Sequence, residues 1–128
     1  MTHTVLLLED DPVIHELLDA VLTDEGHHVR PCGSREQLLA AARDVPASLA
    51  VVDFWGDSHE RLADHERADV VQLARAVPTV LVTARTWANA DVAGDLGLVG
   101  LVRKPFDIDE LCAAVADALD AARPVAVA

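Results

Sequence analysis

Short, nearly uninterrupted apolar runs recur along this chain and constrain its fold more than any other feature. They lie at residues 4–8, 49–52, 79–82 and 98–102, with a weaker run at residues 27–32. Apolar residues at successive positions are typical of strands that are covered on both faces. Amphipathic stretches separate the runs, and strands that alternate with helices fold into an α/β sandwich with a parallel sheet.

The stretches between the runs carry helix-start signals. Asp11-Pro12 is typical of an N-cap and a first helical residue, and Ser34 with Gln37 forms a capping box. Asp107 caps a last helix, and we expect its inner face to comprise Ile108, Leu111, Cys112, Val115 and Leu119.

Two stretches give weaker signals. The segment 57–69 is mostly charged and is predicted to be a solvated face or loop, with helical periodicity returning at Val70. Residues 87–96 predict a weak helix that ends at Gly97. With these two helices the chain has five strands alternating with five helices.

Polar residues gather where the predicted strands end. The first strand is followed by Glu9-Asp10-Asp11, the third by Asp53, the fourth by Thr83-Ala84 and the fifth by Lys104-Pro105. In a sheet of order 2-1-3-4-5 these strands are neighbours, and ligands bind outside their carboxyl ends. Each residue alone has an ordinary explanation as a cap, turn or strand residue. Together, carboxylates, a lysine and a threonine predict a pocket that holds a hard cation and a transferred phosphoryl group.

The net charge of the chain limits the kinds of binding partner that we expect. The net charge is −12, from 22 acidic and 10 basic residues. Such a surface repels a phosphate backbone, so we expect no direct nucleic-acid binding, whereas a magnesium ion or a basic partner surface suits it. Lys104 is the only lysine in the chain, which suggests a site that needs a compact ammonium.

Cellular location follows from what the sequence contains. No apolar run approaches the length of a membrane span, and the start has no basic region of a secretory signal. Cys32 and Cys112 are expected to be reduced thiols. We therefore expect a cytoplasmic protein that does not associate with membranes.

The ordered motifs resemble those of response-regulator receiver domains. The resemblance rests on Val5-Leu-Leu-Leu-Glu-Asp-Asp-Pro12, Asp53 after Leu-Ala-Val-Val, Thr83-Ala84 and Lys104-Pro105-Phe106, and covers about residues 3–121. It implies a flavodoxin-like (βα)5 three-layer sandwich. It also implies a receiver domain at residues 1–123, followed by a tail at 124–128 with no effector domain.

The resemblance also implies a role for each site residue. Asp53 is the phospho-acceptor; Asp10, Asp53 and the Trp55 carbonyl bind Mg²⁺ directly, and Glu9 binds it through water. Phosphoryl oxygens are held by Thr83, the Ala84 N–H and Lys104, and the Lys104–Pro105 bond is expected to be cis. The implied donor is a sensor histidine kinase or phosphotransfer protein. The implied output is a conformational change read by a protein partner, so the chain is no enzyme beyond its own phosphotransfer and dephosphorylation.

Three features depart from the family pattern. Leu101 stands where members usually carry an aromatic residue or histidine that turns inward when the threonine moves. The loop after Asp53 lacks the family's Pro and Gly turn, and residues 85–96 carry few charges. We expect switching to move the loop after Thr83 and the helix start at Trp87.

Two bulky residues flank the expected approach of water to the acceptor. Trp55 and Arg85, each two positions after a site residue, are predicted to slow hydrolysis of the aspartyl phosphate.

Alternatives remain at this stage. A degenerate receiver that acts as a phosphorylation-independent interaction module is favoured by Leu101 and disfavoured by the intact acidic pocket. An aspartyl phosphatase similar to haloacid dehalogenases needs a second Asp where Trp55 stands. A flavin carrier needs Ser, Thr and Gly after the first strand rather than three acids.

Overall fold

The computed structural model describes residues 3–53 and 61–121, and the following elements refer to those ranges. The chain runs through β1 (Thr4–Leu8), α1 (Pro12–Asp24), β2 (His28–Pro31), α2 (Arg35–Asp44), β3 (Leu49–Val52), α3 (Asp64–Ala76), β4 (Thr79–Thr83), α4 (Ala90–Leu96), β5 (Gly100–Arg103) and α5 (Ile108–Ala121).

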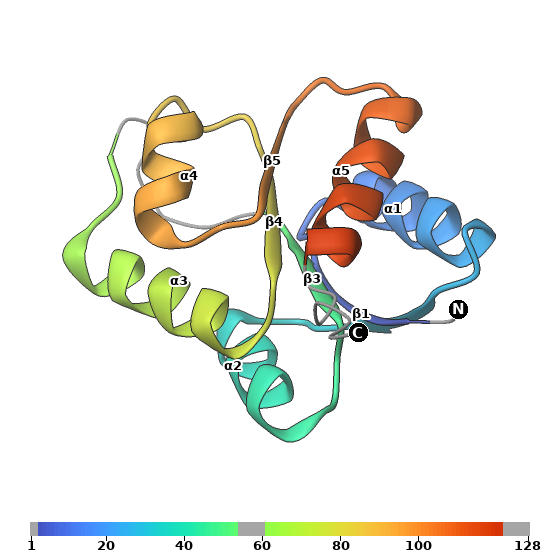
Figure 1. Ribbon diagram of the computed structural model, residues 1–128, viewed down its shortest axis with the longest axis horizontal. Helices are drawn as coiled ribbons and strands as arrows, with labels where there is room; N and C mark the ends of the chain where they lie inside the picture. Colours follow the sequence, from blue (N-terminus) through green and yellow to red (C-terminus); the bar gives the residue numbers. More distant parts are fainter. Residues whose placement is uncertain (1–2, 54–60, 122–128) are drawn as a thin grey trace, which may run out of the picture.

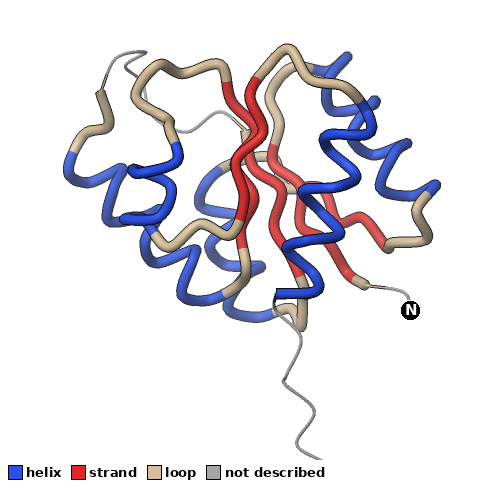
Figure 2. Tube along the Cα trace, turned by 45° about the horizontal axis from the view of Figure 1, so that its top comes forward, coloured by secondary structure: helices blue, strands red, loops and turns tan. Residues whose placement is uncertain are grey.

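Within the described ranges the strands form one parallel sheet of five, in the order β2-β1-β3-β4-β5. Both the flavodoxin-like fold class and the predicted strand order are thereby confirmed. The register places Leu8 beside Val52 and Thr83 beside Arg103, so the carboxyl ends of these strands lie along one edge. Figure 2 shows the strands between helices on either side.

Helices cover both faces of the sheet and give three layers. Figure 1 shows α1 and α5 on one side and α2, α3 and α4 on the other. In β3, Leu49 and Val51 pack with the α1 and α5 side, and Ala50 and Val52 pack with the opposite side. This alternation explains why the apolar runs are continuous, since each side chain of β3 is buried in one of two cores.

The predicted helix starts at Asp11 and Ser34 are confirmed. The Asp11 carboxylate accepts hydrogen bonds from the backbone N–H groups of Val13 and Ile14, at 2.9 and 3.3 Å. The Ser34 hydroxyl accepts one from the Gln37 N–H at 3.1 Å. Each oxygen satisfies a backbone donor that the first helical turn leaves without an intrahelical partner.

The charged segment was predicted to be a solvated face or loop, and over its second half it is a helix whose residues are mostly exposed, apart from Glu66. Its first residues, 57–60, lie outside the described ranges, but Asp64 to Asp69 form the first half of α3. Glu66 explains the difference, because its side chain is buried and accepts a hydrogen bond from the Ala63 N–H at 3.0 Å. The carboxylate therefore caps the helix, which a count of charges does not reveal.

Three further boundaries or faces differ from expectation. The fourth helix begins at Ala90, capped by the Asn89 side chain on the Val92 N–H at 2.9 Å, so Trp87 precedes the helix. Strand β5 begins at Gly100, two residues later than predicted. Ile108 was expected inside, yet it is 50% exposed. Helix α5 therefore turns its first residue to solvent.

No helix in the described part of the chain combines the length and the apolar character that crossing a bilayer requires.

Candidate functional site

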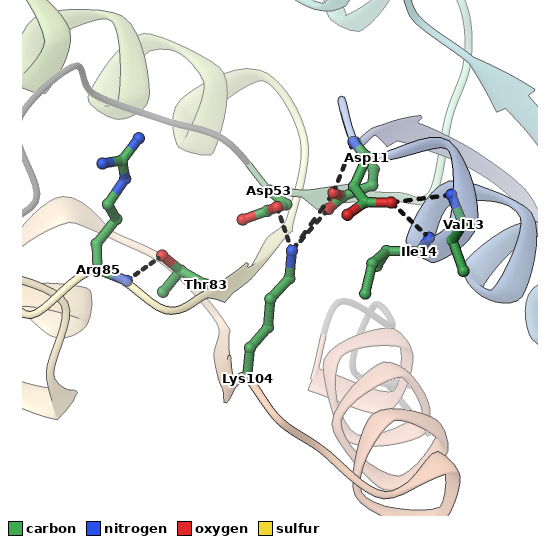
Figure 3. A network of polar contacts seen from close by, with 8 residues as sticks. Asp11, Val13, Ile14, Asp53, Thr83, Arg85 and Lys104 are labelled. Atoms are coloured by element: carbon green, nitrogen blue, oxygen red, sulfur yellow. Dashed lines mark hydrogen bonds and ion pairs between the residues drawn. The ribbon is translucent and has the colours of Figure 1, made fainter.

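The predicted site residues meet at the carboxyl edge of the sheet. Glu9 and Asp10 follow β1, and Asp53 follows β3, where its backbone N–H donates to the Leu8 carbonyl at 2.7 Å. Thr83 ends β4, and the Lys104 N–H after β5 donates to the Thr83 carbonyl at 2.9 Å. Each of these groups ends a strand or directly follows one, so all lie at the same edge of the sheet. Figure 3 shows Asp53, Thr83 and Lys104 at this edge.

One ammonium joins two of the carboxylates. Lys104 Nζ lies 2.5 Å from Asp53 Oδ2, and 3.2 and 3.4 Å from the Glu9 oxygens. Its side chain is 19% exposed, and the carboxylates are buried further. Ion pairs that are shielded from water are screened little by salt. The lone lysine is thus placed where the sequence predicted a compact cation.

Three carboxylates form a cluster beside this ammonium. One oxygen each from Glu9, Asp10 and Asp53 lies within 4.8 Å of the others. Glu9 and Asp53 are buried, whereas Asp10 is exposed. The cluster is therefore open to solvent through Asp10 and closed on its other side.

The electrostatics of the cluster favour an additional cation. Burial, together with the hydrogen bond and charge of Asp53, raises the pKa of Glu9 to about 8. Burial alone would lower the pKa of Lys104, but Asp53 and Glu9 raise it on balance. Oxygen ligands that repel one another fit a hard divalent ion, which removes the penalty on the charged form. The expected Trp55 ligand lies outside the described residues.

Thr83 and Ala84 stand at the end of β4. The Thr83 hydroxyl is buried and accepts a hydrogen bond from the Arg85 N–H at 2.9 Å, and Ala84 is exposed. A hydroxyl that accepts one bond still has a proton to donate. This geometry fits the predicted use of Thr83 as a donor to an anion.

The peptide bond between Lys104 and Pro105 is cis, which confirms that prediction, and the ammonium points into the pocket rather than to solvent. Figure 3 shows the Lys104 side chain rising toward Asp53 from the end of β5.

The residues expected to switch or gate the site lie around β4 and β5. Leu101 is partly buried and packs against the core on the α4 side. Trp87 is only 8% exposed, and it lies in the segment before α4 rather than at a helix start. Arg85 is half-buried, and Trp55 lies outside the described residues. The gating role remains a prediction.

Sequence reasoning missed Arg103, the last residue of β5. Its guanidinium donates to the backbone carbonyl of Arg85 at 3.2 Å and also to the carbonyl of Ala88. Only its place in the strand, two residues after Leu101 and so on the same face, could have drawn attention to it.

Comparison with known proteins shows which class of protein the chain is similar to. No family model matches the chain. It is 34% identical over 119 residues to the DNA-binding response regulator MtrA of Mycolicibacterium smegmatis, covering 90% of this chain and 50% of the relative. It is 31% identical to the probable transcriptional regulatory protein TcrX of Mycobacterium tuberculosis, covering 84% and 46%. The chain thus spans about half the length of these relatives.

A solved structure agrees in fold. The CheY-like receiver domain protein from Methanospirillum hungatei superposes with a TM-score of 0.75 at 19% identity, covering 95% of this chain and 97% of that one. Doubly wound sheets of this kind bind ligands at their carboxyl edge, which is where this chain carries its acids and its lysine. The chain belongs to the receiver domains of the two-component response-regulator family.

Proposed function

We propose that this receiver domain accepts a phosphoryl group on Asp53 and passes the signal on through a change of its surface. The donor is a phosphohistidine of a sensor histidine kinase or phosphotransfer protein, and the reader is a protein partner rather than nucleic acid. The supporting observation is the environment of Asp53, a carboxylate at the end of a central strand with an ammonium 2.5 Å away and two further carboxylates beside it. Residues 1–123 form the receiver unit and the cytoplasm is its location in this proposal.

The reaction is a transfer between two nucleophiles. An Asp53 oxygen forms a bond to phosphorus while the phosphorus–nitrogen bond of the donor breaks, and the electron pair of that bond goes to the imidazole nitrogen. The Lys104 ammonium and the Thr83 hydroxyl donate to the phosphoryl oxygens, with the Ala84 N–H as a third donor. Before transfer, the Lys104 contact fixes the orientation of the Asp53 carboxylate.

Magnesium is the proposed cofactor. Asp10 and Asp53 would hold it directly and Glu9 through water, with the Trp55 carbonyl as a further ligand. The ion would neutralise charge among the carboxylates and the transferred phosphoryl group. The oxygen-only donor set and the raised pKa of Glu9 support this choice.

Mass spectrometry after incubation with acetyl phosphate and magnesium tests the function. Wild type should gain the mass of one phosphoryl group, and omission of magnesium should abolish the gain. Asp53→Asn should gain none, whereas Asp64→Asn, an exposed acid in α3, should behave as wild type. Labelling of Asp53→Asn to the wild-type extent would overturn the assignment.

A second candidate has one observation in its favour. Leu101 is an apolar side chain packed into the core and cannot act as a rotating aromatic reporter. A receiver that binds its partner independently of phosphate would need no such reporter. Partner binding that is equally tight for wild type and Asp53→Asn, with no labelling of either, would favour this candidate.

A further inference from the structure

Arg103 occupies the face of β5 that Leu101 shares. Val102 between them is buried in the core formed with α1 and α5, whereas Leu101 packs on the opposite side, toward α4. Since side chains alternate along a strand, Arg103 also points to the α4 side, one pleat nearer the carboxyl edge. Its backbone pairs with Thr83 in the neighbouring strand.

From this position the guanidinium spans the segment between β4 and α4. One nitrogen donates to the Arg85 carbonyl at 3.2 Å and the other to the Ala88 carbonyl. Arg85 also donates its N–H to the Thr83 hydroxyl, and the Ala88 N–H donates to the Arg85 carbonyl at 3.3 Å. The same short segment is therefore tied to Thr83 at one end and to Arg103 at both ends.

Trp87 lies between the two carbonyls that Arg103 holds. Only 8% of Trp87 is exposed, yet its ring N–H has no hydrogen-bond partner among the described residues. A buried donor without a partner is unfavourable and would be satisfied by water on exposure. The segment thus holds a side chain in a position that combines favourable apolar burial with an unsatisfied polar atom.

We propose that Arg103 is a positioning residue that couples the site to Trp87 in this chain. It takes the place of the aromatic side chain that family members usually carry at the position of Leu101. Its paired bonds hold residues 85–88 in the resting arrangement and keep Trp87 buried. A phosphoryl group that engages the Thr83 hydroxyl acts on this segment through Arg85, and release of the Arg103 bonds exposes Trp87. The coupling rests on the proposed function, but the clamp on the resting domain does not.

Tryptophan fluorescence in a Trp55→Phe background tests the clamp, because Trp87 is then the only indole. Without metal, the indole should resist quenching by acrylamide. Arg103→Leu keeps an apolar stem but no donor, and it should raise the quenching constant at least twofold and shift emission to the red. Arg103→Lys retains one cationic donor and should fall between. Arg43→Leu removes an exposed arginine from α2 and should match the background.

The coupling is read from the response to beryllofluoride with magnesium. The quenching constant of the background protein should increase. Arg103→Leu, in which the bonds to residues 85–88 are already lost, should show less than half of this increase.

A resting quenching constant unchanged in Arg103→Leu would overturn the clamp, and a full response in that variant would overturn the coupling. Circular dichroism checks folding, and Arg103→Gln replaces any variant that does not fold. No response in the background protein, with a changed resting signal in Arg103→Leu, would count against the proposed function and leave the clamp standing.

Discussion

Lys104 Nζ lies 2.5 Å from Asp53 Oδ2 and 3.2 Å from Glu9 Oε2, so that one ammonium bridges the ends of β1, β3 and β5. The contact both orients the acceptor and offsets repulsion between two buried carboxylates. The contact also links separate parts of the sheet, because Lys104 directly follows β5, a strand that does not pair with β1 or β3.

Replacing this lysine should therefore affect stability as well as labelling. We expect Lys104→Met, measured by urea unfolding without metal, to lower the free energy of unfolding by about 2 kcal/mol, since two partly buried carboxylates lose a charged donor. Labelling by acetyl phosphate should fall at least tenfold. Lys104→Arg, which keeps the charge, should lose less stability. Unfolding of Lys104→Met at the wild-type urea concentration would contradict the bridging role.

Magnesium should stabilise the fold through the carboxylate cluster. An ion that binds only the folded state at 100 times its dissociation constant adds about 2.7 kcal/mol. The melting temperature should rise on addition of magnesium and return after chelation. Asp10→Asn should lose most of this rise, because it removes an exposed ligand without touching the Lys104 bridge. Equal melting of wild type with and without saturating magnesium would argue against the metal site.

His27, which lies away from the site, makes the free energy of unfolding depend on pH. Its pKa is lowered below 6.5, first by burial and then by the charge of His3. The folded state therefore favours the neutral ring, and stability present above pH 6.5 is lost as the pH falls through the lower folded pKa. The buried Nδ1 has no partner among the described residues, which agrees with this penalty.

The measurement is the free energy of unfolding between pH 7.5 and 5.5, compared between His27→Gln and wild type. His27→Gln should lose less stability than wild type on acidification. His28→Gln, at an exposed neighbouring position, should follow wild type. Glu9 has a raised pKa, so its own contribution to stability rises on acidification. Because both proteins contain Glu9, this contribution cancels when His27→Gln is compared with wild type. Parallel curves for His27→Gln and wild type would refute the assignment.

The fold and most of the site could be read from the sequence because both follow from buried strands. Continuous apolar runs locate the strands, and the polar residue that ends each run must then lie at one edge. Asp53 and Lys104 were found in this way, although they are 51 residues apart and meet at 2.5 Å.

Other features depend on contacts between distant segments and leave little local trace. Glu66 belongs to a charged stretch, yet it is buried beside Arg35, with 3.4 Å between the ion-pair atoms. Trp87 is an isolated aromatic residue in a segment whose path is fixed by Arg103, and no periodicity reports such a contact. Charge and spacing alone could not distinguish these buried residues from surface ones.

Hydrolysis of the aspartyl phosphate gives the last prediction. Hydrolysis needs water in line with the bond between Asp53 and phosphorus, and we expect the approach to pass the residues two positions after Asp53 and after Thr83. Arg85, the second of these, is half-buried at the end of β4, where Figure 3 shows its side chain extending from the strand end beside Thr83. A guanidinium can bind a phosphoryl oxygen but is a poor base for positioning water.

We therefore expect a long-lived label in wild type and a label lifetime at least fivefold shorter in the double variant Trp55→Asn, Arg85→Glu, because an amide and a carboxylate can orient the attacking water. The measurement is loss of the phosphoryl mass after removal of acetyl phosphate. Arg43→Glu, the same charge change at an exposed position in α2, is the control and should keep the wild-type lifetime. A double variant that keeps its label as long as wild type would show that Trp55 and Arg85 do not protect the phosphoryl group.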